Sequence, residues 1–353
     1  MATRKGKMLG LAYLGVFALI VIGYFVFVFP WMLEWGATEA ESAMPLPGDD
    51  IVVDPSYRST RAVTVEAPVE DVWPWIAQLG QDRGGFYSYS WIENLLLADI
   101  HNARTINPAW LIRGEGELLP LTSPNYPLGL IKRKERSVGP HVRRFESNRA
   151  VVLEGWGSFM LQSPTGGKTR FIVRDATKPM PLPTRILWSL LFEPGHFAME
   201  REMMKGIKAR AEGTAGSGSV WQSLATTGFI LTALIGGFLV AFTRRKWLWL
   251  AVPFIYAATI LIATADPQAA LVGFTAFTLI IAGCLNFRSW RWAYLLSMFV
   301  YINAVLLLPW DAYAVFGLIF LIASLGLLLR VLSKKELVSS IKSREEARRK
   351  SRG

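Results

Sequence analysis

Residues 61–80 read RAVTVEAPVEDVWPWIAQLG, and the hydrophobic period changes in the middle of this stretch. Apolar and polar side chains alternate in its first seven residues, where Val63 and Val65 lie on the same face. An alternation with a period of two residues is typical of a β-strand that is buried on one side. The sequence therefore predicts a strand in the first third of the stretch.

The rest of the stretch has the signals of a helix. Pro68 suits the first helical position, where a backbone N–H is not needed, and Glu70 and Asp71 lie at the positive end of the helix dipole. Pro74 should kink or shorten the helix. One face carries an apolar stripe made of Val72, Trp75, Ile76 and Leu79.

Short apolar runs bounded by turn residues predict further strands along the chain. After Pro183 the sequence predicts two helical pieces, which Pro194 and Gly195 separate. A strand, then helices, then antiparallel strands and a long last helix is the order of an α+β helix-grip fold, in which a curved sheet wraps around a helix and leaves a cavity. The further strands are expected at 115–120, 127–133, 141–146, 149–154, 156–162 and 169–176.

This region resembles the START-like domains of the SRPBCC superfamily, and one bacterial branch of it in particular. The superfamily includes polyketide cyclases and lipid-transfer domains. The resemblance covers about residues 34–212 and implies a hydrophobic cavity without implying a reaction. The motifs that carry it occur in order: WGATEAE (35–41), LPGDD (46–50), VWPWIAQLGQ (72–81), GGFYSYSWIENLL (84–96), DIHNARTINPAW (99–110) and GHFAMEREMMKGIKARAE (195–212).

Outside this region the apolar residues are concentrated in blocks of about 20, each long enough to cross a hydrocarbon core about 30 Å thick. The first block has basic residues before it and no small-x-small cleavage site, so we expect an uncleaved signal anchor. The sequence thus predicts an all-α transmembrane bundle of six helices, and the five C-terminal ones resemble no family. The blocks run over about 8–29, 221–243, 247–264, 268–287, 291–309 and 312–330.

The distribution of charge predicts the orientation of these helices. Formal net charge is +11, but residues 30–220 hold 21 Lys and Arg against 22 Asp and Glu. The other 17 of the 38 basic residues form four clusters, at 4–7, 244–246, 288–291 and 330–352, which six alternating spans place on one side. The positive-inside rule makes that side cytoplasmic. We expect a multi-pass protein of the cell membrane with both termini in the cytoplasm and the START-like domain outside it.

These patterns divide the chain into six expected parts. The first linker is rich in small, acidic and turn residues and is expected to be loop-like. The parts are an N-terminal signal anchor (1–29), an extracytoplasmic linker (30–58), the START-like domain (59–212), a second linker (213–219), a five-helix transmembrane region (220–331) and a basic cytoplasmic tail (332–353).

The composition argues against several kinds of site and partner. Basic residues gather beside the predicted spans, and outside these clusters there is no basic face with interleaved aromatics, so the bilayer is an expected partner and nucleic acid is not. The single cysteine, Cys284, lies in a predicted span, which excludes disulfides and cysteine chemistry from the external domain. His101, His141 and His196 are about 40 to 55 residues apart in the sequence and have no metal-ligand spacing. We therefore expect neither a metal nor a cofactor.

His196 and Glu200 are weak candidates for catalysis. They are four residues apart on the predicted last helix and share a face. In a cavity, the pair could polarise a carbonyl or move a proton. The favoured interpretation is a histidine at a helix start that forms an ion pair on the surface. The sequence 200–202, Glu-Arg-Glu, is similarly expected to be solvated or to bridge elements through salt bridges.

The aromatic-rich stretch 84–97 and the methionines of the last helix are candidate walls of an apolar cavity. In a strand-like conformation, Tyr87 and Tyr89 would face one way and Phe86 the other. Methionine adapts to irregular apolar ligands. The candidate ligand-binding residues are Trp75, Tyr87, Tyr89, Trp91, Trp156, Phe159, His196, Met199 and Met203.

The expected function is binding of a membrane lipid or another hydrophobic molecule in an apolar cavity, for lipid transfer or sensing. Two alternatives stay open. One is a cyclase- or hydratase-like enzyme that acts on a hydrophobic substrate through His196, Glu200, Tyr87 and Tyr89, although no catalytic constellation is evident. The other is a structural or accessory subunit whose C-terminal helices engage a membrane-protein partner.

Overall fold

The computed structural model of the chain describes residues 22–123, 138–164, 166–216 and 251–264, together with a few residues between 231 and 281. These residues belong to two compact units. The first contains 22–88, 102–121 and most of 138–215, and the second contains 89–101 and 251–264.

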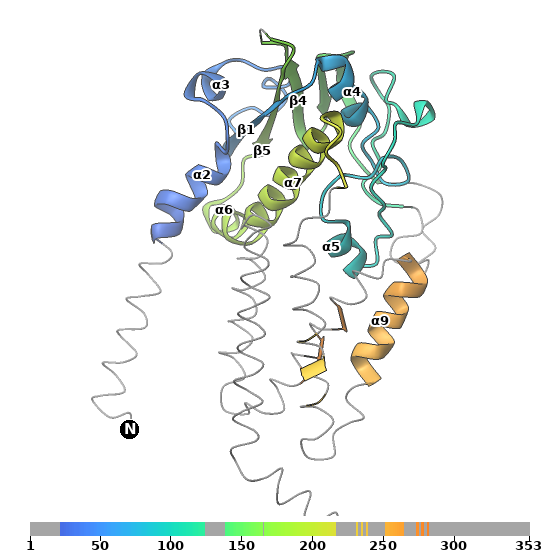
Figure 1. The fold of residues 1–353 in the computed structure, drawn as a ribbon. Coiled ribbons are helices and arrows are strands. Elements are labelled where there is room, and N and C mark those ends of the chain that lie inside the picture. The colour runs from blue at the N-terminus through green and yellow to red at the C-terminus, as the bar shows by residue number, and fades with distance from the viewer. Residues whose placement is uncertain are drawn as a thin grey trace, which may run out of the picture. The chain divides into compact units, whose positions relative to one another are not determined.

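The first unit is an α+β structure built on one five-stranded antiparallel sheet, as the sequence predicted (Figure 1). The order of the strands in the sheet is β1-β5-β4-β3-β2. Four of the strands lie within a residue or two of their predicted positions, whereas β1 begins earlier. The strands are β1 (Tyr57–Val65), β2 (Val142–Glu146), β3 (Ala150–Leu153), β4 (Gly157–Gln162) and β5 (Thr169–Thr177).

The strand expected at 115–120 is reduced to an isolated bridge between Leu118 and His141. Pro120 and Pro140 lie beside this bridge, and neither has an N–H to extend a ladder of hydrogen bonds. The strand expected at 127–133 lies outside the described residues.

Two helices cover the inner face of the sheet. They are α4 (Val69–Ala77) and α7 (Glu193–Ala211), which pack on the strands and on each other (Figure 1). In the antiparallel register, Arg61 of β1 lies opposite Val173 of β5, which lies opposite Phe159 of β4. All three side chains are buried on this face. As expected, α4 is short, with Pro74 in its second half.

The segment before β1 differs from the loop-like linker that its composition predicts. It contains α2 (Phe29–Leu33) and α3 (Glu39–Ala43), and Thr38 and Glu41 form a reciprocal capping box at the start of α3. Leu46, just beyond, packs on Ala62 and Ile172 of the outer face of the sheet. The segment is ordered because this apolar face has to be covered.

The last helical region is continuous, contrary to the expected break at Pro194. It consists of α6 (Leu182–Leu187), a π-helical segment η3 (Trp188–Phe192), and α7. Pro194 lies in the first turn of α7, where its missing N–H is not needed. The wider π turn closes just before it, with the N–H of Glu193 donating to the carbonyl of Trp188.

The stretch 84–88 is a turn and not a strand, so its side chains do not alternate between two faces. Tyr87 has a φ of 54°, and both Phe86 and Tyr87 are buried. Asn102 fixes this turn: its Oδ1 accepts from the N–H of Tyr87 at 2.7 Å, and its Nδ2 donates to the carbonyl of Ser88 at 2.9 Å.

The second unit pairs α5 (Ser90–Leu95) with α9 (Ala251–Thr264). The buried side chain of Asn94 exchanges two hydrogen bonds with the backbone of Ile100, at 2.7 and 3.0 Å. These bonds close the loop after α5. One apolar cluster in this unit includes Trp91, Leu97, Tyr256 and Ala257.

No helix within the described ranges is both long and apolar enough to cross a bilayer. The expected spans at 291–309 and 312–330, and the tail at 332–353, lie outside the described residues. The remaining expected spans, at 8–29, 221–243, 247–264 and 268–287, are described only in part.

The close approach of α7 to the turn at Tyr87 generates a first prediction. A Cβ added at Gly206 would lie 2.1 Å from the carbonyl oxygen of Tyr87. We expect Gly206→Ala to destabilise the protein by about 1–3 kcal/mol, since overpacking forces the backbone to shift. Gly195→Ala, on the same helix, meets no atom within 4 Å and is expected to be neutral or stabilising by up to about 1 kcal/mol. Thermal unfolding of the full chain measures both, and equal effects would refute the argument.

Candidate functional site

Arg61 is completely buried and lies between two carboxylates of α7. Its Nη1 donates to Oε1 of Glu200 at 2.7 Å, and its Nη2 donates to Oε1 of Glu193 at 2.5 Å. Its Nε donates to the carbonyl of Met32 at 2.8 Å. One guanidinium group thus joins β1, α7 and the end of α2.

The geometry of β1 and α7 explains why Arg61 meets the two carboxylates. Arg61 shares its strand face with Val63 and Val65, and this face is turned towards α7. On α7, Glu193 and Glu200 are seven residues apart, so both carboxylates lie on one side of the helix.

His196 lies between the same two carboxylates. Its Nδ1 is 3.8 Å from Oε2 of Glu193, and its Nε2 is 3.6 Å from Oε2 of Glu200. Both distances exceed a hydrogen bond. Oε2 of Glu193 instead accepts from the hydroxyl of Tyr57 at 2.9 Å. Nδ1 of His196 and Oε2 of Glu200 are buried and have no hydrogen-bond partner among the described residues.

The favoured expectation of a surface ion pair at His196 and Glu200 is wrong. Glu200 is only 3% exposed, and the side chain of His196 is 18% exposed. Arg201 is buried as well, so Glu200 and Arg201 are not solvated. The other expectation for this segment, a salt bridge between elements, is confirmed by the contact of Glu200 with Arg61.

The electrostatics of the cluster favour the ionised forms of its members. Burial would lower the pKa of Arg61, but the charges of Glu200 and Glu193 outweigh it and raise that pKa. Burial would raise the pKa of Glu193, but His196 and Arg61 hold it below its usual range. The pKa of His196 is raised, because its interactions with the two carboxylates outweigh burial.

Asp175 completes the cluster from the neighbouring strand, β5. It lies opposite Ser59 of β1, on the inner face. Burial raises the pKa of Asp175 to about 6, and the charges of Glu200 and Glu193 add to this effect, whereas His196 and Arg61 act against it. The pKa of this carboxyl therefore lies well above the ordinary range of an aspartate.

Sequence reasoning missed Arg61, Asp175, Tyr57 and Glu193 as members of a site. A signal for Arg61 was present, since it stands in the same phase of the strand as Val63 and Val65. A charged residue in the buried phase of a strand requires a buried partner. The partners themselves are 132 and 139 residues away in the sequence, and no local pattern identifies them.

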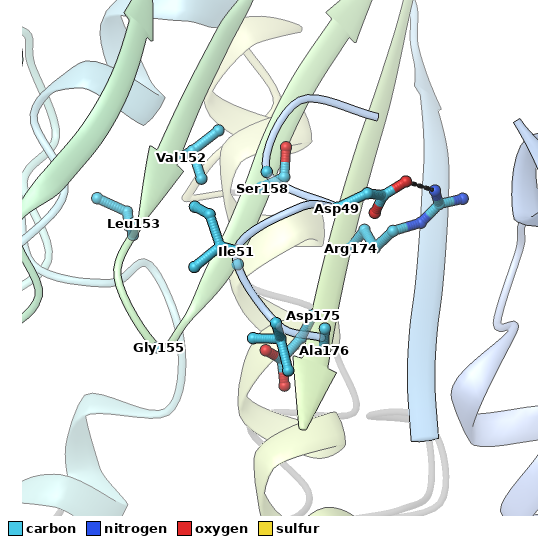
Figure 2. Close-up of a pocket in the computed structure, with 12 residues that line it drawn as sticks. Asp49, Ile51, Val152, Leu153, Gly155, Ser158, Arg174, Asp175 and Ala176 are labelled. Carbon is cyan, nitrogen blue, oxygen red and sulfur yellow. Dashed lines mark hydrogen bonds and ion pairs between the residues drawn. The ribbon is translucent and has the colours of Figure 1, made fainter. Parts of the chain in front are cut away.

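A small pocket lies on the outer face of the sheet, beneath the loop 48–52 (Figure 2). Ile51 lies between Arg174 and Val152 in this pocket, and Arg174 forms an ion pair with Asp49 at 2.8 Å. The guanidinium of Arg174 makes five hydrogen bonds, enough to occupy all its N–H groups. Its charge therefore holds the segment before β1 in place and is not free for a ligand. The acceptors are Thr60 Oγ1, Asp49 Oδ2 and the carbonyls of Glu41, Ser42 and Met44.

Trp156 and Phe159, two of the candidate ligand-binding residues, are brought together by the structure. Their rings are 5.4 Å apart and lie in a row that runs from Phe86 through Trp156 and Phe159 to Phe171. Met203 is buried in the interior, whereas Met199 is half-buried and its carbonyl accepts from the hydroxyl of Ser88.

Trp75 and Tyr87 form a separate pair, with ring centroids 5.7 Å apart. The hydroxyl of Tyr87 accepts from Nε2 of Gln78 at 2.8 Å, and the guanidinium of Arg210 lies 4.5 Å above its ring. Tyr87 is therefore fixed by packing near the C-terminal end of α7.

Tyr89 and Trp91 belong to the second unit, where their rings are 6.4 Å apart. Within the first unit, the candidate residues thus form two separate aromatic groups, one at Trp156 and Phe159 and one at Trp75 and Tyr87.

Comparisons with protein-family models, with curated proteins and with solved structures find no match for this chain.

Removal of Arg61 tests the cluster. In Arg61→Met, two carboxylates stay buried without their cation, and we expect a loss of about 3–5 kcal/mol at pH 8. The pKa values of these carboxyls should rise in the folded variant. The loss should therefore shrink towards pH 5, where they can bind protons. Thermal unfolding of the full chain at several pH values measures this.

Arg149→Met is the matched control, because Arg149 pairs with Glu146 at an exposed turn, where the two side chains are 62% and 41% exposed. It should change stability little at either pH. A loss in Arg61→Met that does not depend on pH would contradict the burial of uncompensated charge.

For Asp175 we expect the opposite effect on stability: a substitution that removes its charge should stabilise the protein near neutral pH. Its pKa of about 6 in the folded protein exceeds the usual unfolded value of about 3.9. Ionisation therefore opposes folding as the pH rises through 6, by up to about 3 kcal/mol at neutral pH. We expect Asp175→Asn to be more stable than the natural chain at pH 7.5 and equal to it near pH 4. Asp54→Asn, at an exposed position, should show no such pH dependence, and parallel pH–stability curves for both variants would be the contrary result.

Proposed function

We propose that the chain is a membrane-anchored, extracytoplasmic START-like protein that binds a lipid or another hydrophobic small molecule. The row of aromatic rings between the sheet and its covering helices carries this proposal. Within the row Trp156 is half-buried, whereas its neighbour Phe86 is buried and Phe159 and Phe171 are fully buried. Such a row is a continuous series of apolar contacts that leads from a half-buried turn residue into the interior.

The helix-grip arrangement supports the proposal. The inner face of the sheet is apolar along its centre, with Phe159, Phe171 and Val173 completely buried. The long helix α7 lies across this face and adds Met203 and Met204 (Figure 1). Rings and thioethers make a wall that can adjust to an irregular apolar ligand.

Trp156 is in a suitable position to admit a ligand. It lies in the turn between β3 and β4, flanked by Gly155 and Gly157 with φ values of 72° and 127°. A Cβ at Gly157 would lie 2.3 Å from the carbonyl oxygen of Arg174, so this glycine lets the turn lie against β5. As a turn residue, Trp156 can move its ring without breaking a strand pair.

The enzyme alternative has less support. Glu200 is tied to Arg61, and His196 lies beside Glu200 in the first two turns of α7, whereas Tyr87 packs on Gly206. Ten residues separate His196 from Gly206, which is about 15 Å along a helix axis. The residues required for acid–base chemistry are therefore spread along the helix.

The membrane anchor and the orientation rest on the sequence. Six apolar blocks and the one-sided basic clusters support a multi-pass protein with both termini in the cytoplasm. The proposed ligand would then enter from the outer face of the membrane. The proposed partners of the chain are therefore a membrane lipid, as the ligand, and the bilayer, which surrounds the predicted spans.

Photo-crosslinking with a bifunctional fatty-acid or phospholipid probe tests ligand binding. The full chain in nanodiscs would be incubated with the probe, irradiated and digested, and the labelled peptides identified by mass spectrometry. We expect label on β4 and β5 as well as on the predicted spans. Trp156→Ala should lose most of the label on the strands and keep that on the spans.

Trp110→Ala is the matched control, because Trp110 is also half-buried but ends the 3-10 helix η2 (Pro108–Trp110), outside the aromatic row. It should keep the label on the strands. Label confined to the predicted spans in the natural chain would overturn the proposed function.

A further inference from the structure

The helix α6 and the segment η3 present apolar side chains to the outside. Leu182, Ile186, Leu187 and Phe192 are 58%, 44%, 58% and 49% exposed, and we call them the α6–η3 surface. A surface helix of a soluble protein turns such side chains towards its core. This reversal indicates that the medium or partner in contact with the surface is itself apolar.

The charges within the segment 178–192, which contains this surface, are all of one sign. Residues 178–192 read KPMPLPTRILWSLLF and contain Lys178 and Arg185 but no acidic residue. Both basic side chains are exposed. Basic groups beside an apolar helix face are typical of a helix that lies in a membrane interface, where they meet anionic headgroups.

The N-terminal helical region lies beside η3. It begins with the π-helical segment η1 (Tyr24–Val28), and the hydroxyl of Tyr24 donates to the carbonyl of Ser189 at 2.5 Å. This region is also apolar on its outside: Ile22, Val26, Phe27 and Trp31 are 57%, 56%, 73% and 48% exposed. The two exposed apolar surfaces belong to neighbouring elements of the same unit.

We propose that the α6–η3 surface docks on the lipid bilayer as a second membrane contact, beside the N-terminal segment. The sequence at 8–21 continues the apolar run of η1 and α2, and the run is long enough for a membrane anchor. The medium that surrounds Val26 and Phe27 is therefore available to Leu187 and Phe192. Trp31 and Trp188 supply the aromatic side chains that favour the boundary between lipid and water.

This docking would link the bilayer to the buried charge cluster. The α6–η3 surface is continuous with α7, and the rings of Phe192 and His196 are stacked with centroids 5.8 Å apart. A shift of the surface in the membrane would therefore reach His196 and Glu193 within one helical turn. The proposal rests on the membrane anchor of the proposed function, but it does not require the ligand.

Depth-dependent fluorescence quenching tests the proposal in the full chain reconstituted in anionic liposomes. Cys284 would be replaced by serine, and single cysteines at Leu187→Cys, Ala18→Cys and Ser147→Cys would carry an environment-sensitive fluorophore. An interfacial helix buries its apolar face about 5–10 Å below the headgroups. The probe at 187 should be quenched more by a nitroxide near the top of the acyl chain than by one at its end.

The other two positions are the controls. Residue 18 lies near the middle of the predicted anchor and should show the reverse order of quenching. Ser147 is exposed in the turn between β2 and β3 and should show little quenching by either lipid. Leu182→Glu with Ile186→Glu, added to the Leu187→Cys chain, should abolish the quenching at 187 and leave residue 18 unchanged.

The outcomes separate the two proposals. Quenching at 18 without quenching at 187 overturns the docking and leaves the anchor standing. No quenching at either position overturns the anchor as well. A probe at 187 that is shielded from lipids but crosslinks to a second copy of the chain makes the surface a protein interface and also overturns the docking.

Discussion

A guanidinium group with no exposed surface has to find its counter-charges in the interior, and Arg61 imposes this requirement on the first unit. Two carboxylates of α7 and the carbonyl of Met32 satisfy it. Breaking such a pair leaves a buried charge without compensation, so the three elements have to stay together. The positions of the first turns of α7 and of the end of α2 relative to β1 therefore depend on one side chain.

The opposite end of α7 is held by a different kind of interaction. There the backbone of Gly206 approaches Tyr87 so closely that no side chain fits between them, and Arg210 lies over the ring of Tyr87. Charge neutralisation fixes the first turns of the helix, and close packing fixes the last. The part between them carries the buried side chains of Met203 and Met204, whose contacts are apolar and less directional. A rigid frame around an adaptable interior suits the binding of a hydrophobic molecule.

Local patterns predicted most of the sheet, because the period of apolar residues and the turn residues determine where strands lie. They failed where distant groups decide the structure. No local pattern indicates that Arg61 meets Glu200, which is 139 residues away, so Glu200 was expected to pair with His196 on the surface, whereas it is buried. Pro194 was expected to break a helix, but the π turn before it moves this residue into a first turn. The aromatic run at 84–97 seemed to be one feature, yet Tyr87 and Tyr89 belong to different units.

The π-helical segment η3 has a consequence for the angular phase of the helix. A π turn holds more residues than an α turn, so side chains before it are rotated about the axis relative to those after it. Ahead of η3, Leu182 and Ile186 face outwards, and beyond it Phe197 and Met203 face the core. The apolar face of one continuous helical region therefore points outwards before η3 and towards the core after it. The π turn rotates this face about the helix axis, so that the same backbone can contact two different environments.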